Sequence, residues 1–409
     1  MSTSLLYHAW GLRGYTYFST EYREGTVIFH IRHNPESLVC AECESDDLIR
    51  RGTVEREFRT LPVGGKPVRL RLPVQRVECR RCGALRQAKL GFAESRFSYT
   101  RAFERYALDL LRHATIQDVA HHLDIGWDAV KEIQKRHLRR RYGKPKLKHL
   151  RRIAIDEISI GRGHRYLTVV LDLDSGAVVF VGDGKGADAL LPFWQRLRRS
   201  GAKIEAVATD MSPAYIAAVT AHLPDAALVF DRFHVMKLYN AKLSDLRRAL
   251  QREATSKLQM RALKGTRWLL LKNAETLEEE RRGRRLSERE RLERALGLNE
   301  PLACAYYLKE DLRRFWEQGS KRAAEAFLQD WIDRARASGI RMLQQFAKTL
   351  AGHRLGLLSW YDHRISTGPL EGTNTKIRVM QRQSYGLRDH EFQKLKIYAI
   401  HEAKYALVG

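Results

Sequence analysis

The spacing of hydrophobic and polar positions changes along this 409-residue chain. In residues 1–92, runs such as TVIFHI and PVRLRLPV alternate apolar with polar or basic residues, which predicts strands joined by turns such as LPVGG. Residues 93–145 and 236–365 have apolar positions at helical spacing and predict helices. In residues 150–235, short β-branched runs and two helical segments predict the order strand, strand, strand, helix, strand, helix, strand. This is the element order of a mixed sheet with crossover helices, as in ribonuclease H-like folds.

Four of the five cysteines form two C-x-x-C pairs within the strand-rich segment. They are Cys40, Cys43, Cys79 and Cys82. Each pair can bring two thiolates to one ion, and two pairs complete a tetrahedral zinc shell. A shell of four protein ligands leaves no open position, so we expect a structural Zn²⁺. Cys304 has no partner nearby in sequence and is expected to be a small buried hydrophobe.

The sequence TIQDVAHHLDIGWDAVKEIQKRH predicts a helix-turn-helix. The small Ala120 lies where two helices must cross closely, and Asp124 occupies a turn position where the backbone tends toward positive φ. The second helix is expected from Trp127 to His137 and would enter a DNA major groove. An ordinary helical hairpin is the alternative interpretation.

The net charge of +25 indicates a polyanionic partner, and the charge is concentrated after this unit. Residues 131–152 contain eleven Lys or Arg and one acid. Such a run neutralises phosphates, so double-stranded DNA is the expected partner, with an anionic membrane surface as the weaker alternative. The positions expected to contact DNA here are Trp127, Lys131, Lys135, Arg136, Arg139, Arg140, Arg141 and Lys144.

Location is indicated by what the chain lacks. No run of about 18 apolar residues occurs, which argues against a membrane span, and the N-terminal residues lack the pattern of a secretory signal. Paired cysteines that fit a metal site indicate a reducing compartment. We therefore expect a cytoplasmic protein.

Three acids are candidates for a catalytic metal site. Asp156 and Asp210 lie at the ends of the first and fourth strands predicted in 150–235, and Glu371 follows Gly-Pro at the start of a late helix. The first and fourth strands of a ribonuclease H-like sheet are adjacent, so these carboxylates can meet. Their mutual repulsion would be relieved by two Mg²⁺ (or Mn²⁺) ions, which support phosphoryl transfer. For Glu371 alone, complementing the helix dipole is the alternative.

These features together resemble the ISL-three family of bacterial insertion-sequence transposases, which belong to the DDE group. The resemblance rests on the paired cysteine knuckles, the helix-turn-helix, IDEISIGRGHRYLTVVLDLDSG, ATDMSPAY, VFDRFHV and STGPLEGTNTKIRVMQRQSYGLRDHEFQKLKIY. It implies a multidomain α+β and α/β chain, with a ribonuclease H-like catalytic core interrupted by a helical insertion. The implied parts are a zinc-binding domain (1–92), a helix-turn-helix domain (93–145), the first part of the core (150–235), the insertion (236–365) and the closing helices (366–409). It also implies that Asp156, Asp210 and Glu371 are the catalytic triad.

Further residues have two possible roles. Asp231 and His234 in DRFH close the fifth strand and, by the resemblance, support the site; strand-end hydrogen bonding is the alternative. On the late helix, Lys376 and Arg378 are expected to contact DNA. Asn374 is expected to share a helix face with Arg378. That face would meet DNA phosphates, and a merely solvated face is the alternative. Four tryptophans are expected in a helical core rather than in a base-stacking row. They are Trp268, Trp316, Trp331 and Trp360.

The resemblance implies an enzyme that binds terminal inverted repeats, cuts DNA at the element ends and joins the freed 3′-hydroxyl to target DNA. Two ends must be brought together, so a homodimer or larger assembly on the DNA of the bacterial nucleoid is expected. A domesticated DNA-binding protein without transposition activity is the first alternative. A nuclease for RNA–DNA hybrids is the second, but it leaves the helix-turn-helix without a purpose.

Overall fold

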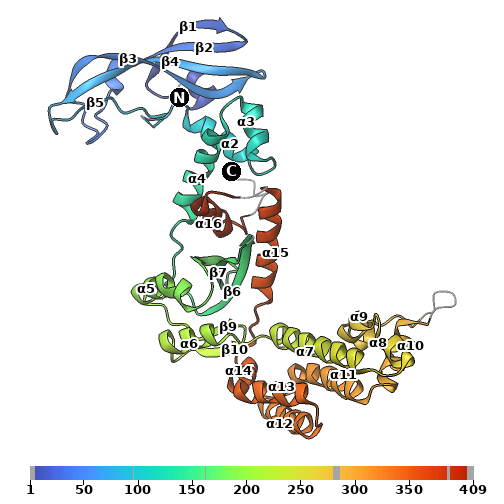
Figure 1. The fold of residues 1–409 in the computed structure, drawn as a ribbon. Helices are drawn as coiled ribbons and strands as arrows, with labels where there is room; N and C mark the ends of the chain where they lie inside the picture. Colours follow the sequence, from blue (N-terminus) through green and yellow to red (C-terminus); the bar gives the residue numbers. More distant parts are fainter. Residues whose placement is uncertain (1–4, 95, 162, 280–285, 385–386, 403–409) are drawn as a thin grey trace. The chain divides into compact units, whose positions relative to one another are not determined.

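The structure is a computed structural model that describes residues 5–94, 96–161, 163–279, 286–384 and 387–402. The chain forms two compact units, one up to Arg141 and one from Tyr142 to Glu402 (Figure 1). Within the described ranges, no helix has the length and apolar character that crossing a membrane requires.

The N-terminal part of the first unit is a five-stranded sheet in the order β1-β2-β4-β3, with β5 paired to β4. Its elements are α1 (Leu5–Trp10), β1 (Tyr15–Arg23), β2 (Thr26–His33), the 3₁₀ turn η1 (Pro35–Ser37), β3 (Leu48–Val63), β4 (Lys66–Cys79) and β5 (Leu85–Gln87). Side chains alternate across a strand, so Val68, Leu70 and Leu72 of β4 are buried on one face with Phe58 of β3. The predicted alternation and the turn between β3 and β4 are confirmed.

Three helices complete the first unit: α2 (Arg101–Leu110), α3 (Ile116–Leu123) and α4 (Trp127–Tyr142). The predicted helix-turn-helix is confirmed, and Asp124 in its turn has a φ of 47°. Arg59 of β3 donates a hydrogen bond of 2.6 Å to the backbone carbonyl of Asp124, which ties the turn to the sheet. The second helix ends at Tyr142 rather than at His137, because the arginines that follow are good helix formers.

The second unit is built on a five-stranded sheet in the order β10-β9-β6-β7-β8. Its first elements are β6 (Arg152–Gly161), β7 (Arg165–Asp172), β8 (Val178–Asp183), η2 (Ala187–Leu190), α5 (Leu191–Ser200), β9 (Ala206–Thr209), α6 (Pro213–His222) and β10 (Ala227–Phe230). Strand β6 pairs antiparallel with β7 and parallel with β9, and β9 pairs parallel with β10. The predicted order of strands and helices is confirmed, including the adjacency of the first and fourth strands.

Helices cover both faces of this sheet. Ile153 and Ile155 of β6 are buried in one core with residues of α5 and α6. Ala154 and Ile158 of the same strand are buried in a second core with Leu370 of α15 (Gly368–Gln383), and α16 (His390–Tyr398) packs on the same face. Figure 1 shows α15 running beside the sheet. The middle of β6, which carries Asp156, therefore lies under α15.

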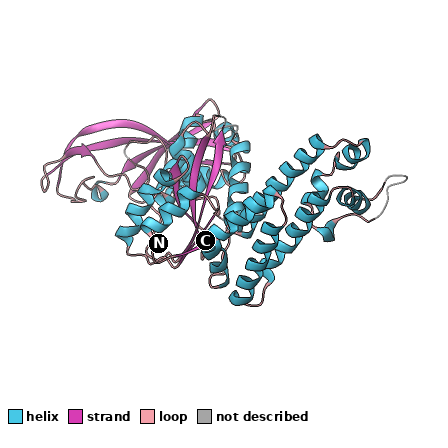
Figure 2. Ribbon diagram, turned by 60° about the horizontal axis from the view of Figure 1, so that its bottom comes forward, coloured by secondary structure: helices cyan, strands magenta, loops and turns pink. Residues whose placement is uncertain are grey.

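The segment between β10 and α15 is a helical insertion with its own core (Figure 2). Its elements are α7 (Arg232–Glu253), α8 (Lys257–Leu263), α9 (Arg267–Leu271), η3 (Ala274–Thr276), α10 (Glu288–Gly297), α11 (Glu300–Arg313), η4 (Arg314–Glu317), α12 (Lys321–Ala337), α13 (Arg341–Gly352), α14 (Arg354–Leu358) and η5 (Ser359–Tyr361). As predicted, Trp316 and Trp331 are buried in this core, and Trp360 and Cys304 pack against it partly buried.

The prediction for Trp268 was wrong, because its side chain is 66% exposed. Helix α9 has only five residues, and Leu269 and Leu270 take its positions in the core. The tryptophan before them is left on the outer side of the helix.

Candidate active site and zinc site

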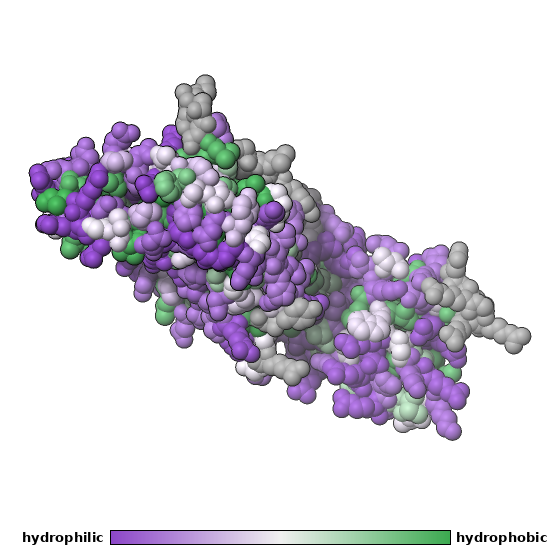
Figure 3. Space-filling model, turned by 90° about the horizontal axis from the view of Figure 1, so that it is seen from above, coloured by the Kyte–Doolittle hydropathy of each residue, from purple (hydrophilic) through white to green (hydrophobic). Residues whose placement is uncertain are grey.

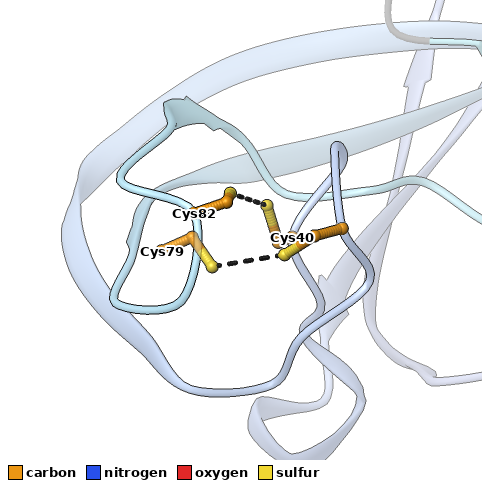
Figure 4. Close-up of side chains that lie close together, drawn as sticks. Cys40, Cys79 and Cys82 are labelled. Atoms are coloured by element: carbon orange, nitrogen blue, oxygen red, sulfur yellow. Dashed lines mark hydrogen bonds between the residues drawn. The ribbon is translucent and has the colours of Figure 1, made fainter.

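The two cysteine pairs meet at one end of the N-terminal sheet (Figure 4). The sulfur of Cys40 lies 3.7 Å from that of Cys82, and the sulfur of Cys43 lies 3.5 Å from that of Cys79. All four ligand atoms lie within 4.8 Å of one another. In the described part of the chain, no other group of three or more Cys, His, Asp or Glu side chains is as close. A tetrahedral shell with Zn–S bonds of about 2.3 Å separates the sulfurs by roughly 3.8 Å. The cluster therefore fits a structural zinc ion.

Strand pairing brings the two knuckles together. Cys79 is the last residue of β4 and pairs with Leu48, which begins β3 shortly after the first knuckle. The backbone N–H of Cys82, together with the Cys43 thiol, lowers the pKa of Cys79 to about 7. A thiolate therefore forms there near neutral pH, and the thiolate is the form that binds zinc.

Three aspartates of β6, β9 and β10 lie at the same level. Asp210 and Asp231 directly follow β9 and β10, as expected for Asp210. Asp156 was expected at the end of its strand, and this was wrong: it lies in the middle of β6, which runs on to Gly161 through its pairing with β7. The parallel pairing of β6 and β9 ends at Ala154 and Ala208, and Asp156 and Asp210 each lie two residues further on. Phe230 of β10 pairs with Thr209 of β9, so Asp231 is level with Asp210. Adjacent strands lie about 4.8 Å apart. The aspartates share the face that α15 covers, because the residues two positions before them belong to the core under α15.

Helix α15 bonds to the outer two of these aspartates. The Thr367 hydroxyl, just before the helix, donates a hydrogen bond of 2.7 Å to Oδ2 of buried Asp231. Two turns later, Nδ2 of Asn374 donates one of 2.8 Å to Oδ2 of Asp156. Glu371 lies four residues after Thr367 and three before Asn374, so all three share one helix face. Its exposed side chain therefore projects from the part of α15 between the two hydrogen bonds.

Asn374 was expected beside Arg378 on a DNA-facing or solvated surface, and this was wrong. Its side chain is 3% exposed and bonded to Asp156, whereas Arg378 is exposed. Neither Thr367 nor Asn374 was recognised as a partner of the aspartates. The signal in the sequence was their spacing from Glu371. Thr367 lies four residues before it and Asn374 three residues after it, which places all three on one face of a helix.

The electrostatics of the strand ends favour a bound cation. Burial is the main reason that the pKa of Asp156 is raised, and the nearby carboxylates of Asp210 and Glu157 act in the same direction. The backbone N–H of Glu157 and the imidazole of His234 oppose this effect. The oxygens fit a hard divalent ion such as Mg²⁺. Among the described residues, the ligand atoms of these acids do not come as close together as the four sulfurs do.

Glu157 is not part of this group of acids. It follows Asp156 on the same strand and therefore points to the other face of the sheet, where its Oε2 accepts a hydrogen bond of 3.1 Å from the Tyr215 hydroxyl of α6. Tyr215 belongs to the core on the opposite face of the sheet.

Comparison with known proteins agrees with this arrangement. Residues 153–397 match the family model of the ISL3 DDE domain, described as a transposase. The chain belongs to the ISL3 family of transposases. Residues 88–138 match the helix-turn-helix domain of transposase family ISL3. Residues 36–82 match the zinc-finger of transposase IS204/IS1001/IS1096/IS1165.

Curated relatives of this ISL3 protein match along most of their length. The transposase for insertion sequence element IS1001 of Bordetella parapertussis is 31% identical over 395 residues, which cover 95% of this chain and 96% of the relative. The transposase for insertion sequence element IS1557 of Mycobacterium tuberculosis is 31% identical, covering 88% of this chain and 85% of the relative. A chain of the Drosophila P element transposase strand transfer complex is 13% identical, with a TM-score of 0.40 over 75% of this chain and 92% of that one.

The helix-turn-helix match of this ISL3 protein covers most of α4, where most of the residues expected to contact DNA lie. The Trp127 side chain is exposed, and Nζ of Lys131 lies 5.5 Å from the centre of its ring. Lys135 is half-buried. The exposed basic residues that follow are Arg139, Arg140, Arg141 and Lys144. On α15, Arg378 is exposed, and Nζ of exposed Lys376 lies 3.2 Å from Nδ1 of His401.

Arg136 differs from these residues. Its side chain is 17% exposed, forms an ion pair with Glu104 of α2, and lies 3.8 Å over the ring of Phe97. The guanidinium is thus bound within the first unit, which explains this residue as part of the packing between α2 and α4.

Proposed function

We propose that this protein is the transposase of a bacterial insertion sequence, which binds the terminal inverted repeats, cuts DNA at the element ends and joins the freed ends to target DNA. The level arrangement of Asp156 and Asp210 on adjacent strands, under the helix that carries Glu371, is the observation that supports it most. Acids from distant parts of the sequence are thereby directed to one edge of the sheet, and this edge is open to a large substrate because Glu371 is exposed.

Asp156, Asp210 and Glu371 would hold Mg²⁺ or Mn²⁺. When bound, two such ions activate a water or a 3′-hydroxyl and stabilise the leaving oxygen in an in-line displacement. No covalent link between protein and DNA is needed, so no serine or tyrosine nucleophile is essential.

The residues around the acids hold them in position. The amide of Asn374 and the backbone N–H of Glu157 each donate a hydrogen bond of 2.8 Å to the Asp156 carboxylate, one to each oxygen, and so fix its orientation. Asp231 joins the end of β10 to the start of α15 through Thr367, and so fixes the helix that carries Glu371. His234 lies close enough to Asp156 to lower its pKa, and a protonated imidazole there would also favour a nearby phosphate.

Basic residues outside the acids would hold the DNA. The exposed arginines of α4 and Lys144 would contact phosphates of the inverted repeat, and Lys376 and Arg378 would contact the strand that is cut. Cutting and joining require both element ends, so a homodimer or larger assembly on DNA in the bacterial cytoplasm is part of the proposal.

The test is cleavage of a labelled duplex that carries one inverted repeat with its flanking DNA, with Mg²⁺ or Mn²⁺. We expect metal-dependent cutting at the repeat boundary that is lost in Asp156→Ala, Asp210→Ala and Glu371→Ala while DNA binding is kept. Asp225→Ala, which removes an exposed acid between α6 and β10, is the matched control and should cut normally. Tight binding without cutting under either metal would instead indicate a DNA-binding protein without transposition activity.

A further inference from the structure

Helices α8 and α9 of the insertion form a surface on which an exposed tryptophan lies among basic residues. We call it the α8–α9 surface. Its exposed members are Lys257, Leu258, Met260, Arg261, Lys264, Arg267 and Trp268. Over the face shown in Figure 3, hydrophobic residues occur only in small separate groups on a mostly hydrophilic surface. A large aromatic side chain in such surroundings needs an explanation.

Folding of the insertion does not explain Trp268. Leu263 of α8 and Leu269 and Leu270 of α9 already provide the buried contacts of these two short helices. Because Trp268 remains 66% exposed, it gains little from the burial that normally stabilises a tryptophan. Its exposed ring is therefore available to a partner.

The charge of this surface identifies the kind of partner. Residues 254–272 contain Lys257, Arg261, Lys264, Arg267 and Lys272 but no acid. Within the described residues, none of the four exposed cations before Lys272 forms an ion pair with an acid. Burial lowers the pKa of Arg247 on the neighbouring helix α7, and the positive charges of Arg248 and Arg267 act in the same direction. Like charges this close in space repel one another. An anion bound here would relieve this repulsion, whereas the same surface of a second copy would increase it.

We propose that the α8–α9 surface binds DNA, with its cations against the phosphates and Trp268 stacked on an unpaired base. The guanidinium of Arg267 lies over the Trp268 ring, 4.9 Å from its centre, so a phosphate-binding group covers one face of the ring and a base would stack on the other. Proteins bind single-stranded nucleic acid with cations placed along its phosphate backbone and with aromatic rings on which its bases stack. This gives the insertion a task that the proposed function does not assign, and it rests on DNA being the substrate.

The experiment compares binding of two 30-base-pair fluorescent duplexes of arbitrary sequence, one fully paired and one with three unpaired bases in its centre. Full-length protein is used without added divalent cation, so that no strand is cut and failure of the catalytic proposal does not affect the result. Trp268→Ala should weaken binding of the unpaired probe by about 10-fold or more, from stacking of one base. It should weaken binding of the paired probe by less than about twofold.

A triple variant tests the cations. Arg261→Gln, Lys264→Gln and Arg267→Gln together should weaken binding of both probes and reduce the dependence of log Kd on log salt by up to about 3. The matched control removes the same charge from exposed positions of α12 and α13, through Arg322→Gln, Arg341→Gln and Lys348→Gln. It should keep the wild-type salt dependence. Melting temperatures of all variants should match that of the wild type, because only exposed side chains are changed.

Two results would overturn the proposal. In the first, Trp268→Ala and the triple variant bind both probes as the wild type does, or no differently from the control triple. In the second, the variants keep wild-type DNA binding but change the molar mass measured by light scattering, which would make the surface a protein interface.

Discussion

Replacing Asn374 by alanine removes the amide that donates a hydrogen bond to Oδ2 of Asp156. This hydrogen bond is 2.8 Å long, and the Asn374 side chain that makes it is only 3% exposed. A hydrogen bond to a charged group contributes about 1.5–3 kcal/mol. If the cutting step needs Asp156 in this orientation, the loss corresponds to a rate about 10- to 150-fold lower, since about 1.4 kcal/mol equals a factor of ten. Losing a residue that orients a metal ligand has effects of about the same size.

The assay is single-turnover cleavage of the inverted-repeat duplex over a range of Mn²⁺ concentrations. We expect Asn374→Ala to lower the maximal rate and to raise the Mn²⁺ concentration at half-maximal rate, with DNA binding unchanged. A residue that served only folding would leave the half-maximal concentration unchanged. Thr375→Ala is the control, because Thr375 is exposed on α15 and its hydroxyl bonds only to the Glu371 carbonyl among the described contacts.

A second variant separates the hydrogen bond from the space that the side chain fills. Asn374→Leu keeps the branched four-atom side chain, somewhat enlarged, but has no donor, so it should be as slow as Asn374→Ala. If leucine restored the rate, the defect of the alanine variant would come from a cavity. If both variants cut within twofold of the wild type at every Mn²⁺ concentration, the positioning role of Asn374 would be refuted.

Three further predictions concern the zinc site, the aspartates and the first unit. The protein should contain about one zinc ion per chain. Cys40→Ala should lose the zinc ion and part of the strand signal in circular dichroism, whereas Cys304→Ala should keep both. Full zinc content in Cys40→Ala would contradict a four-thiolate site. Because burial raises the pKa of Asp156, the free energy of unfolding of the metal-free protein should fall as the pH rises from the ordinary aspartate pKa through the raised one. The Asp156→Asn variant should lack this fall. In calorimetry it should melt at a higher temperature than the wild type at neutral pH. Arg136→Ala should lower the melting temperature by about 2–4 °C for each kcal/mol of stability lost. Arg140→Ala should weaken DNA binding and leave the melting temperature unchanged. The opposite pattern would refute these assignments.

The parts of the site that were predicted are those with a local cause in the sequence. Asp210 directly follows an apolar strand, so it was located by the residues of β9 before it. Asp156 was located only to the right strand, because the sequence does not show that β6 continues past it to Gly161 in its pairing with β7. A C-x-x-C pair brings two thiolates together within its own turn, so the zinc site needed only the meeting of two such turns. Asp124 was expected at positive φ because the helix-turn-helix pattern fixes its place.

The parts that were missed depend on partners far along the chain. Asn374 and Arg378 both belong to a polar, basic stretch, and only the packing of α15 on β6 decides that the amide faces inward. Arg136 lies in a run of basic residues, and its partner Glu104 is on another helix. Trp268 is followed by three leucines, so its hydropathy alone favoured the core, and the five-residue length of α9 left it outside.

The helical insertion brings the chain back to the sheet before α15, although 161 positions separate Glu371 from Asp210 in the sequence. The insertion begins directly after β10 and ends just before α15, and its last helix, α14, returns to β10. Phe230 of β10 belongs to the insertion core, and it packs so closely on Gly356 that a Cβ there would lie 2.3 Å from the ring. Both ends of the insertion are therefore held at the strand whose next residue is Asp231. Because Asp231 then bonds Thr367, the chain enters α15 at a fixed place, and the position of Glu371 depends on this junction rather than on the length of the insertion.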